Sequence, residues 1–206
     1  SPLTVIKLAA DVLVEEEVSA FAQRALQRIR RSVRDMEAML EAFLLLARES
    51  DTGLPQEEFV VNDAVREEAE RAQPLLEGKP VTLELDEQAR FALRAPPRVF
   101  AAMIGNLIRN ACLYTESGSV RVSVGEDSVS IADSGIGMSA EEIARTHQPY
   151  VRAGRRTSAG HGVGLSIVRR LAERFGWPVD LRSEVGAGTV ATIRFPQRLP
   201  APPPAS

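Results

Sequence analysis

Three short segments in the middle of the chain carry residue types that could bind a charged ligand. The first places two asparagines one helical turn apart, the second sets a carboxylate before two glycines, and the third is a run of glycines before an apolar stretch. They read Asn106-Leu-Ile-Arg-Asn110, Asp133-Ser-Gly135-Ile-Gly137 and Gly160-His-Gly162-Val163-Gly164-Leu165. Each pattern also occurs alone as solvated asparagines, a plain turn or a loop, so their meaning depends on their occurring together.

Asn106 and Asn110 share one stripe of a helix that we predict from Pro97 to Tyr114. Asparagine is roughly 0.5 kcal/mol worse than alanine inside a helix, so two in register favour a partner outside it. A side-chain amide oxygen suits Mg²⁺, which takes few protein ligands and completes its shell with water and phosphate oxygens. An external ligand of this kind is one explanation of the pair, and two solvated asparagines are the other.

Asp133 ends a predicted strand that contains Val129 and Ile131. The strand period of two places the carboxylate on the same inward face as these two apolar residues. Because a buried carboxylate is costly without a hydrogen-bond donor, this position predicts a donor beside it.

The glycine run opens a predicted helix, whose free backbone N–H groups and positive end can meet phosphates. The absence of a Gly-Lys-Ser/Thr ending excludes a P-loop, and the glycine spacing is not that of a dinucleotide-binding fold. Residues 139–159 would then form a lid over the ligand. Arg152 of that segment could reach phosphate charge, although a solvated basic loop explains a single arginine as well.

The elements around these segments alternate between strands and helices. We predict strands near residues 59–61, 81–85, 91–93, 120–124, 129–133, 179–183 and 189–195, and helices over 62–76, 97–114 and 163–175. Asn62 or Asp63 should cap the first of these helices. Helices on one face of a mixed, mostly antiparallel sheet give a two-layer α/β sandwich, an α+β fold.

The first quarter of the chain is purely helical in pattern. After a helix over 3–14, apolar residues repeat in steps of four and three at Ala22, Leu26, Ile29, Val33, Met36, Leu40, Phe43 and Ala47. This seam predicts a helical hairpin that forms a four-helix bundle with a second copy, and therefore a homodimer. A hairpin packed on its own domain is the alternative.

Composition excludes several other classes. The 25 basic and 28 acidic residues give a net charge of −3, which does not favour nucleic-acid binding. The single Cys112 excludes an internal disulfide. No apolar run is long enough to span a bilayer, so we expect no membrane contact by this part of the protein.

Together the three segments resemble the nucleotide site of the sensor histidine kinases, the kinase branch of the GHKL (Bergerat) ATPases. Ser1-Pro-Leu-Thr4 resembles the end of that family's phosphoacceptor motif, His-Glu-x-Arg-Ser/Thr-Pro-Leu. The resemblance covers nearly the whole chain and implies that the phosphorylated histidine lies four residues upstream of Ser1. It implies a truncated dimerisation and histidine-phosphotransfer hairpin at 1–53 and an ATP-binding catalytic domain at 56–198. The Pro-rich residues 199–206 should be a disordered tail.

The resemblance also implies a role for each residue of the site. The implied nucleotide contacts are Asn106, Asn110, Tyr114, Asp133, Gly135, Gly137, Arg152, Gly160, Gly162, Val163, Gly164, Leu165 and Thr189. Asn110 would bind Mg²⁺, Asp133 would accept a hydrogen bond from the adenine amino group, and Thr189 would share a water with the adenine. Gly135 and Gly137 would let the backbone approach the ring.

Asn106 bears on the reaction. DNA-remodelling and chaperone members of the superfamily carry a glutamate at this position, where a carboxylate can take a proton from attacking water. An amide cannot do so. The sequence therefore fits a site that delivers the γ-phosphoryl group to a side chain rather than to water.

The chain departs from the family pattern at three places, Leu113, His147 and Tyr150, which puts nucleotide affinity and lid order in question. Neither His147 nor His161 has the neighbours of a phosphoacceptor. Ser1 occupies the position at which relatives orient water to dephosphorylate the partner regulator.

The resemblance thus implies the cytoplasmic core of a two-component sensor histidine kinase, of the kind usually found in bacterial inner-membrane receptors. Its implied ligands are ATP and Mg²⁺, and its implied partners are a second copy and the receiver domain of a response regulator. The chain itself should not autophosphorylate. A non-enzymatic nucleotide-gated dimer and a regulator phosphatase module are the alternatives.

Overall fold

The computed structural model describes residues 53–145 and 163–202, together with Ile29, Val33, Met36 and Leu40. The predicted hairpin at 1–53 therefore lies outside the described residues except for these four positions, which are helical.

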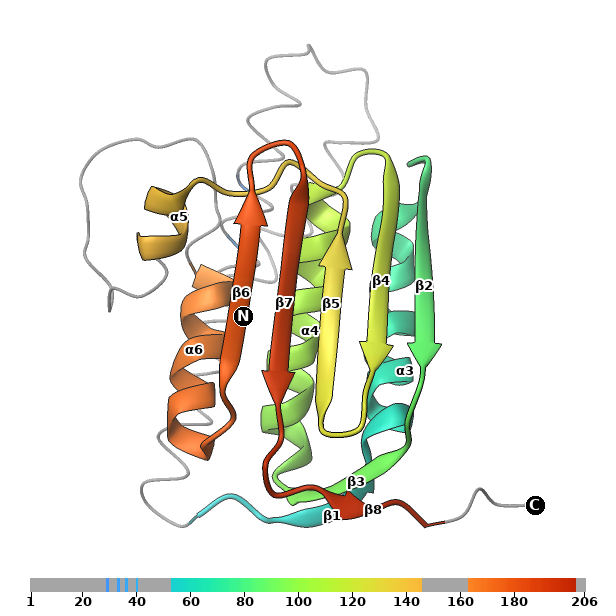
Figure 1. The fold of residues 1–206 in the computed structure, drawn as a ribbon, viewed down its shortest axis with the longest axis vertical. Coiled ribbons are helices and arrows are strands. Elements are labelled where there is room, and N and C mark those ends of the chain that lie inside the picture. Colours follow the sequence, from blue (N-terminus) through green and yellow to red (C-terminus); the bar gives the residue numbers. More distant parts are fainter. Residues whose placement is uncertain are drawn as a thin grey trace.

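A five-stranded sheet with helices on one face forms the body of the described region (Figure 1). The strand order is β2 (Val81–Glu87), β4 (Gly118–Val124), β5 (Ser128–Asp133), β7 (Gly188–Arg194), β6 (Val179–Glu184). Only β2 and β4 pair in parallel, and every other pair is antiparallel. The predicted two-layer sandwich with a mixed, mostly antiparallel sheet is confirmed.

Helices cover one face of the sheet, and the longest of the described helices, α4, begins and ends where the sequence predicts (Figure 1). The helical segments are α3 (Val61–Ala72), the 3₁₀ turn η1 (Gln73–Leu76), α4 (Pro97–Tyr114), α5 (Ala140–Arg145) and α6 (Val163–Phe175). The packing face expected on α4, which includes Ile104, Leu107 and Ile108, is buried against the sheet. Burying a side chain of this size stabilises the fold by about 1.5 to 3 kcal/mol. The core therefore holds α4 firmly across the strands that end at the candidate site.

A second, smaller sheet closes the end of the domain opposite the candidate site (Figure 1). It consists of β1 (Glu57–Val60), β3 (Phe91–Ala95) and β8 (Leu199–Pro200), all antiparallel. Leu199 and Pro200 were expected in a disordered tail, and for these two residues the prediction is wrong. The reason is that buried Phe195 anchors the chain just before them and brings them to the open edge of β3.

Aromatic side chains join the two sheets at this end. The ring centroids of Phe59 and Phe100 are 5.3 Å apart, those of Phe100 and Phe195 are 5.5 Å apart, and those of Trp177 and Phe195 are 5.2 Å apart. Such pairs contribute roughly 0.5 to 1.5 kcal/mol each beyond their buried area. The bulk of the aromatic core thus lies away from the site and leaves the other end of the sheet open for a ligand.

The predicted cap of α3 needs correction. Neither Asn62 nor Asp63 caps α3, because the helix begins at Val61 and its first turn has no side-chain cap. Asn62 is buried instead, and its side-chain amide donates to the carbonyl of Ala89 over 2.9 Å.

The sequence analysis also missed α5. The Oγ atom of Ser139 accepts from the backbone N–H of Glu142 over 3.3 Å, and the carboxylate of Glu142 accepts from the N–H of Ser139 over 2.9 Å. This reciprocal pair is a capping box, so the pattern Ser139-Ala-Glu-Glu142 was the available signal.

No helix among the described residues has the length and apolar character needed to cross a membrane.

Candidate functional site

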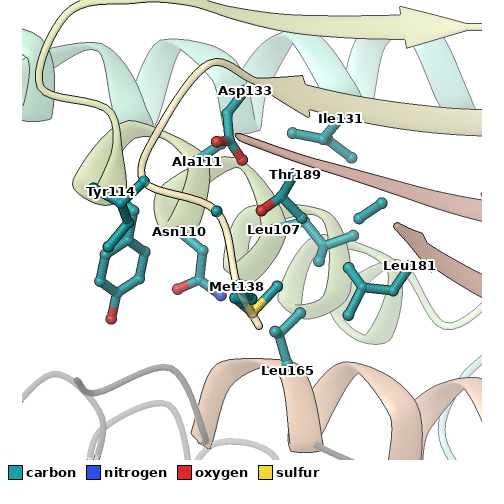
Figure 2. Close-up of a pocket in the computed structure, with 13 residues that line it drawn as sticks. Leu107, Asn110, Ala111, Tyr114, Ile131, Asp133, Met138, Leu165, Leu181 and Thr189 are labelled. Atoms are coloured by element: carbon teal, nitrogen blue, oxygen red, sulfur yellow. The ribbon is translucent and has the colours of Figure 1, made fainter. Parts of the chain in front are cut away.

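One pocket lies where α4 and β5 end and where β7 and α6 begin (Figure 2). Its lining is mostly apolar, with polar groups at its two sides. The lining residues are Leu107, Asn110, Ala111, Tyr114, Ile131, Asp133, Ile136, Gly137, Met138, Leu165, Leu181, Thr189 and Ala191. An apolar cavity with a few polar groups is the usual form of a small-molecule site. Six of the residues predicted to contact a ligand therefore meet in one cavity: Asn110, Tyr114, Asp133, Gly137, Leu165 and Thr189.

Asp133 is the carboxylate of this pocket. It lies opposite Thr189 in the pairing of β5 with β7, and it is half-buried. Burial raises the pKa of the Asp133 carboxyl, while hydrogen bonds from the backbone N–H groups of Gly135 and Thr189 act in the opposite direction. The Gly135 N–H donates over 2.9 Å. The donors expected for a carboxylate at this position are thus present, and the carboxylate keeps lone pairs for a ligand.

Gly135 and Gly137 are required for the packing of the loop after Asp133, and their predicted role in the approach to the ring stays a prediction. A Cβ on Gly135 would overlap the carbonyl oxygen of Tyr114, and a Cβ on Gly137 would lie 2.7 Å from the carbonyl carbon of Glu184. Gly137 also has a φ of +65°, which only glycine adopts without strain. The two glycines therefore let the loop after Asp133 pack closely on the end of α4 and on the end of β6.

The asparagine pair faces the start of α6, as its common stripe predicts. A Cβ on Gly164 would lie 3.1 Å from the Nδ2 atom of Asn110 and 3.3 Å from the Oδ1 atom of Asn106, so the absence of a side chain at Gly164 permits this approach. Asn106 itself is buried, its amide donates to the carbonyl of Ala102 over 2.7 Å, and its oxygen accepts from Arg109. Of the two, only Asn110 lines the pocket.

Lys79 holds the end of α4, and no sequence pattern indicated it. Its ammonium group donates to the carbonyls of Cys112 and Thr115, each over 3.2 Å. A cation at a helix C-terminus meets the negative end of the helix dipole and satisfies carbonyls that lack partners within the helix. The carbonyl of Tyr114 in turn accepts from the N–H of Ile136 over 3.2 Å. Lys79 thus stabilises the end of α4, and the loop after Asp133 is hydrogen-bonded to that end.

Ser183 on β6 is a second residue that the sequence analysis missed. Its hydroxyl lies 2.8 Å from the Thr189 hydroxyl, donates to the Gly188 carbonyl over 2.8 Å, and accepts from the N–H of Met138 over 2.8 Å. Ser183 pairs directly with Thr189 across β6 and β7. One hydroxyl group on β6 therefore links the start of β7 to the loop at Met138, and these segments line the pocket.

Several predicted site residues lie outside the described residues, namely Ser1, Arg152, Gly160 and Gly162, together with His147 and Tyr150. For Val163 the structure describes only that α6 begins there. Leu113 is half-buried. The roles predicted for these residues remain predictions.

Comparison with known proteins identifies the fold around this pocket. The sequence profile described as histidine kinase-, DNA gyrase B- and HSP90-like ATPase matches residues 96–199, which contain α4, Asp133, Gly164 and Thr189. The chain belongs to this ATPase family. The profile of the His Kinase A phospho-acceptor domain matches residues 1–52. The two matches together make the chain the core of a sensor histidine kinase, and the first match supports ATP as its nucleotide.

Curated relatives agree with this assignment. The chain is 37% identical over 109 residues to the histidine protein kinase DivJ of Caulobacter vibrioides, covering 50% of this chain and 18% of DivJ. It is 27% identical over 207 residues to the phosphate regulon sensor protein PhoR of Pseudomonas aeruginosa, covering 95% of this chain and 47% of PhoR. The kinase core therefore spans less than half the length of either relative.

Solved structures show the same fold. Full-length ShkA in complex with AMPPNP aligns with 99% of this chain and 44% of its own, with a TM-score of 0.68 and 23% identity. The cytoplasmic segment of the histidine kinase QseC aligns with 79% of this chain and 94% of its own, with a TM-score of 0.59 and 19% identity.

Proposed function

We propose that the pocket binds ATP with Mg²⁺ and presents the γ-phosphoryl group to a histidine, as the catalytic step of a two-component sensor kinase. The observation that carries this proposal is that Asp133 and Asn110, predicted to bind opposite ends of the nucleotide, line one cavity. The apolar walls provided by Leu107, Ile131 and Leu181 suit a flat base. Transfer then depends mainly on positioning and on neutralisation of phosphate charge.

Each end of the pocket would contribute differently. The Asp133 carboxylate would accept from the amino group of adenine, and Tyr114 would lie against the base. The first backbone N–H groups of α6 would donate to phosphate oxygens, because a helix N-terminus favours anions. Of these residues, Asp133 would fix which base is bound, and the start of α6 would fix where the phosphates lie.

Asn110 would bind the metal. Among the described residues, no cluster of three or more His, Cys, Asp or Glu side chains could hold a metal ion. A single amide oxygen that lines the pocket fits Mg²⁺, which takes most of its shell from water and phosphate. When bound, Mg²⁺ would neutralise phosphate charge that builds up during transfer.

Asn106 supports transfer to a side chain over hydrolysis. An amide cannot remove a proton from water, and here both ends of the amide are already hydrogen-bonded, to Ala102 and to Arg109. The described residues thus provide no general base at the position where hydrolytic members of the superfamily have one.

We also propose that the kinase core is a homodimer that passes its phosphoryl group to a response-regulator receiver domain. Dimerisation and a regulator partner belong to the family in general. Of the apolar seam, Ile29, Met36 and Leu40 are exposed and Val33 is buried, so a second copy of the hairpin would cover the exposed side chains. Residues 1–53 would then form the dimerisation hairpin and 56–198 the catalytic domain, placed on the cytoplasmic side of a bacterial membrane sensor, as the resemblance to the sensor histidine kinases implies.

A transfer experiment between two copies tests the proposal. One copy is this chain, and the other extends upstream to the predicted histidine and carries Asp133→Asn, so that it offers the acceptor but not the ATP site. With γ-labelled ATP, the label should appear on the extended copy in an acid-labile bond. Release of free phosphate without labelling would instead indicate a hydrolase, and ATP binding with neither outcome would indicate a nucleotide-gated dimer.

A further inference from the structure

Ser183 makes three hydrogen bonds with one hydroxyl group, and the direction of each can be assigned. The N–H of Met138 can only donate, so Ser183 accepts from it over 2.8 Å. The carbonyl of Gly188 can only accept, so Ser183 donates its one hydrogen to it over 2.8 Å. The third partner, the Thr189 hydroxyl at 2.8 Å, must therefore be the donor. Ser183 then uses its hydrogen and both of its lone pairs.

This assignment fixes what Thr189 offers to the pocket. Its hydrogen points at Ser183, so the oxygen that lines the pocket carries lone pairs only. Figure 2 shows this oxygen and the Asp133 carboxylate at the same end of the pocket, whereas Asn110 and Tyr114 lie toward the other side. Among the described side chains that line the pocket, this end therefore presents hydrogen-bond acceptors alone.

We propose that Ser183 is a positioning residue that makes the pocket selective for a base that presents an amino group, rather than a carbonyl, to Asp133 and Thr189. The inference rests on the proposed function and adds the residue that determines base specificity through Thr189. An amino group offers two hydrogens to the acceptors of Asp133 and Thr189, so that Thr189 would accept directly rather than through the water that the family resemblance implies. A carbonyl at the same place, as in hypoxanthine or guanine, would face two acceptors, and neither the carbonyl oxygen nor the lone pairs that face it would have a donor, which is how polar pockets reject close analogues.

Binding of ATP and of inosine triphosphate, measured by calorimetry, tests this inference. The wild-type chain should bind ATP more tightly. In Ser183→Ala the Thr189 hydroxyl is free to rotate and donate into the pocket, so the ratio of the two affinities should fall about fivefold or more, which is the effect of one net hydrogen bond. Ser183→Thr keeps the hydroxyl and should restore the ratio.

Ser130→Ala is a matched control. The Ser130 hydroxyl lies 3.0 Å from that of Thr192 between the neighbouring strands β5 and β7, and neither residue lines the pocket. This variant removes a similar hydroxyl pair and should leave the affinity ratio unchanged.

A double variant tests whether Ser183 acts through Thr189. In a Thr189→Val background, Ser183→Ala should not change the ratio further, because the rotating hydroxyl is already absent. If Ser183→Ala weakens both nucleotides equally, its role is only structural and the inference is wrong. If Ser183→Ala does not fold, the inference still requires that Thr189→Val lower the ratio, and an unchanged ratio overturns it. A wild-type chain that binds neither nucleotide would overturn the proposed function first.

Discussion

Gly188 lies at the start of β7, where an added side chain would strike the strand that carries Asp133. Its φ is +94°, and a Cβ there would overlap the carbonyl oxygen of Asp133 and lie 2.8 Å from the carbonyl carbon, closer than the 3.0 Å that real Cβ atoms keep. Gly186, two residues earlier in the same turn, has a φ of +81° but open space around its Cβ position. The pair therefore separates the effect of backbone conformation from that of steric collision.

The two effects can be estimated separately. An alanine at positive φ costs roughly 1 to 2 kcal/mol, and this applies to both positions. A collision with backbone in a packed region adds roughly 1 to 3 kcal/mol. We expect Gly186→Ala to lower the free energy of unfolding by about 1 kcal/mol without changing ATP affinity. Gly188→Ala should lower the free energy of unfolding by about 3 kcal/mol and weaken ATP binding by about tenfold or more, because Asp133 must move.

Urea unfolding and calorimetric ATP titration of the two variants provide the measurements. The difference between the variants matters more than either value, since both share the same turn and the same change of composition. Equal unfolding free energies and equal ATP affinities for Gly186→Ala and Gly188→Ala would refute the claim that β7 packs on the backbone of Asp133.

Three further predictions concern the metal, the carboxylate and the end of α4. Asn110→Ala should remove the Mg²⁺ dependence of ATP binding while leaving the fold intact, and a titration with and without Mg²⁺ checks this; an unaltered metal requirement would exclude Asn110 as the ligand. Burial raises the pKa of Asp133 above its unfolded value of about 3.9. The contribution of this group to stability is therefore fully present below the unfolded pKa and is lost as the pH rises through the folded pKa. The stability of the wild type relative to Asp133→Asn, from urea unfolding at several pH values, should therefore increase as pH falls from 7 toward 4, and a decrease would contradict the burial argument. Lys79→Met should lower the free energy of unfolding by about 1 to 2 kcal/mol because carbonyls at the end of α4 lose their cation, and it should also weaken ATP binding; a variant as stable as the wild type would show that the cap contributes nothing.

The parts of the site that follow from local pattern could be predicted from sequence. Helix α4 begins at Pro97, which is tolerated in a first turn, and its buried residues recur at helical spacing, so its bounds were correct. The alternation of Val129, Ile131 and Asp133 placed the carboxylate on the pocket side of β5. Both predictions rest on periods that depend only on neighbouring residues.

The remaining parts depend on contacts between distant residues. Lys79 lies 33 residues before Cys112, whose carbonyl it caps, and nothing near either residue indicates the contact. Asn62 has the side chain of a helix cap, but its amide pairs with Ala89, 27 residues away, once α3 packs on the sheet. Ser183 gained its role only from the pairing of β6 with β7. Tertiary partners of this kind override local preference, and one sequence alone does not reveal them.

Calorimetric titration of Asp133→Asn with Mg-ATP tests the central claim most directly. We expect affinity to fall by roughly a hundredfold or more, because an amide presents a donor where the adenine amino group needs an acceptor and the charged hydrogen bond is lost. Asp127→Asn, immediately before the other end of β5, should bind ATP as the wild type does. If Asp133→Asn retains wild-type affinity, the base does not lie against Asp133 and the site has been assigned to the wrong cavity.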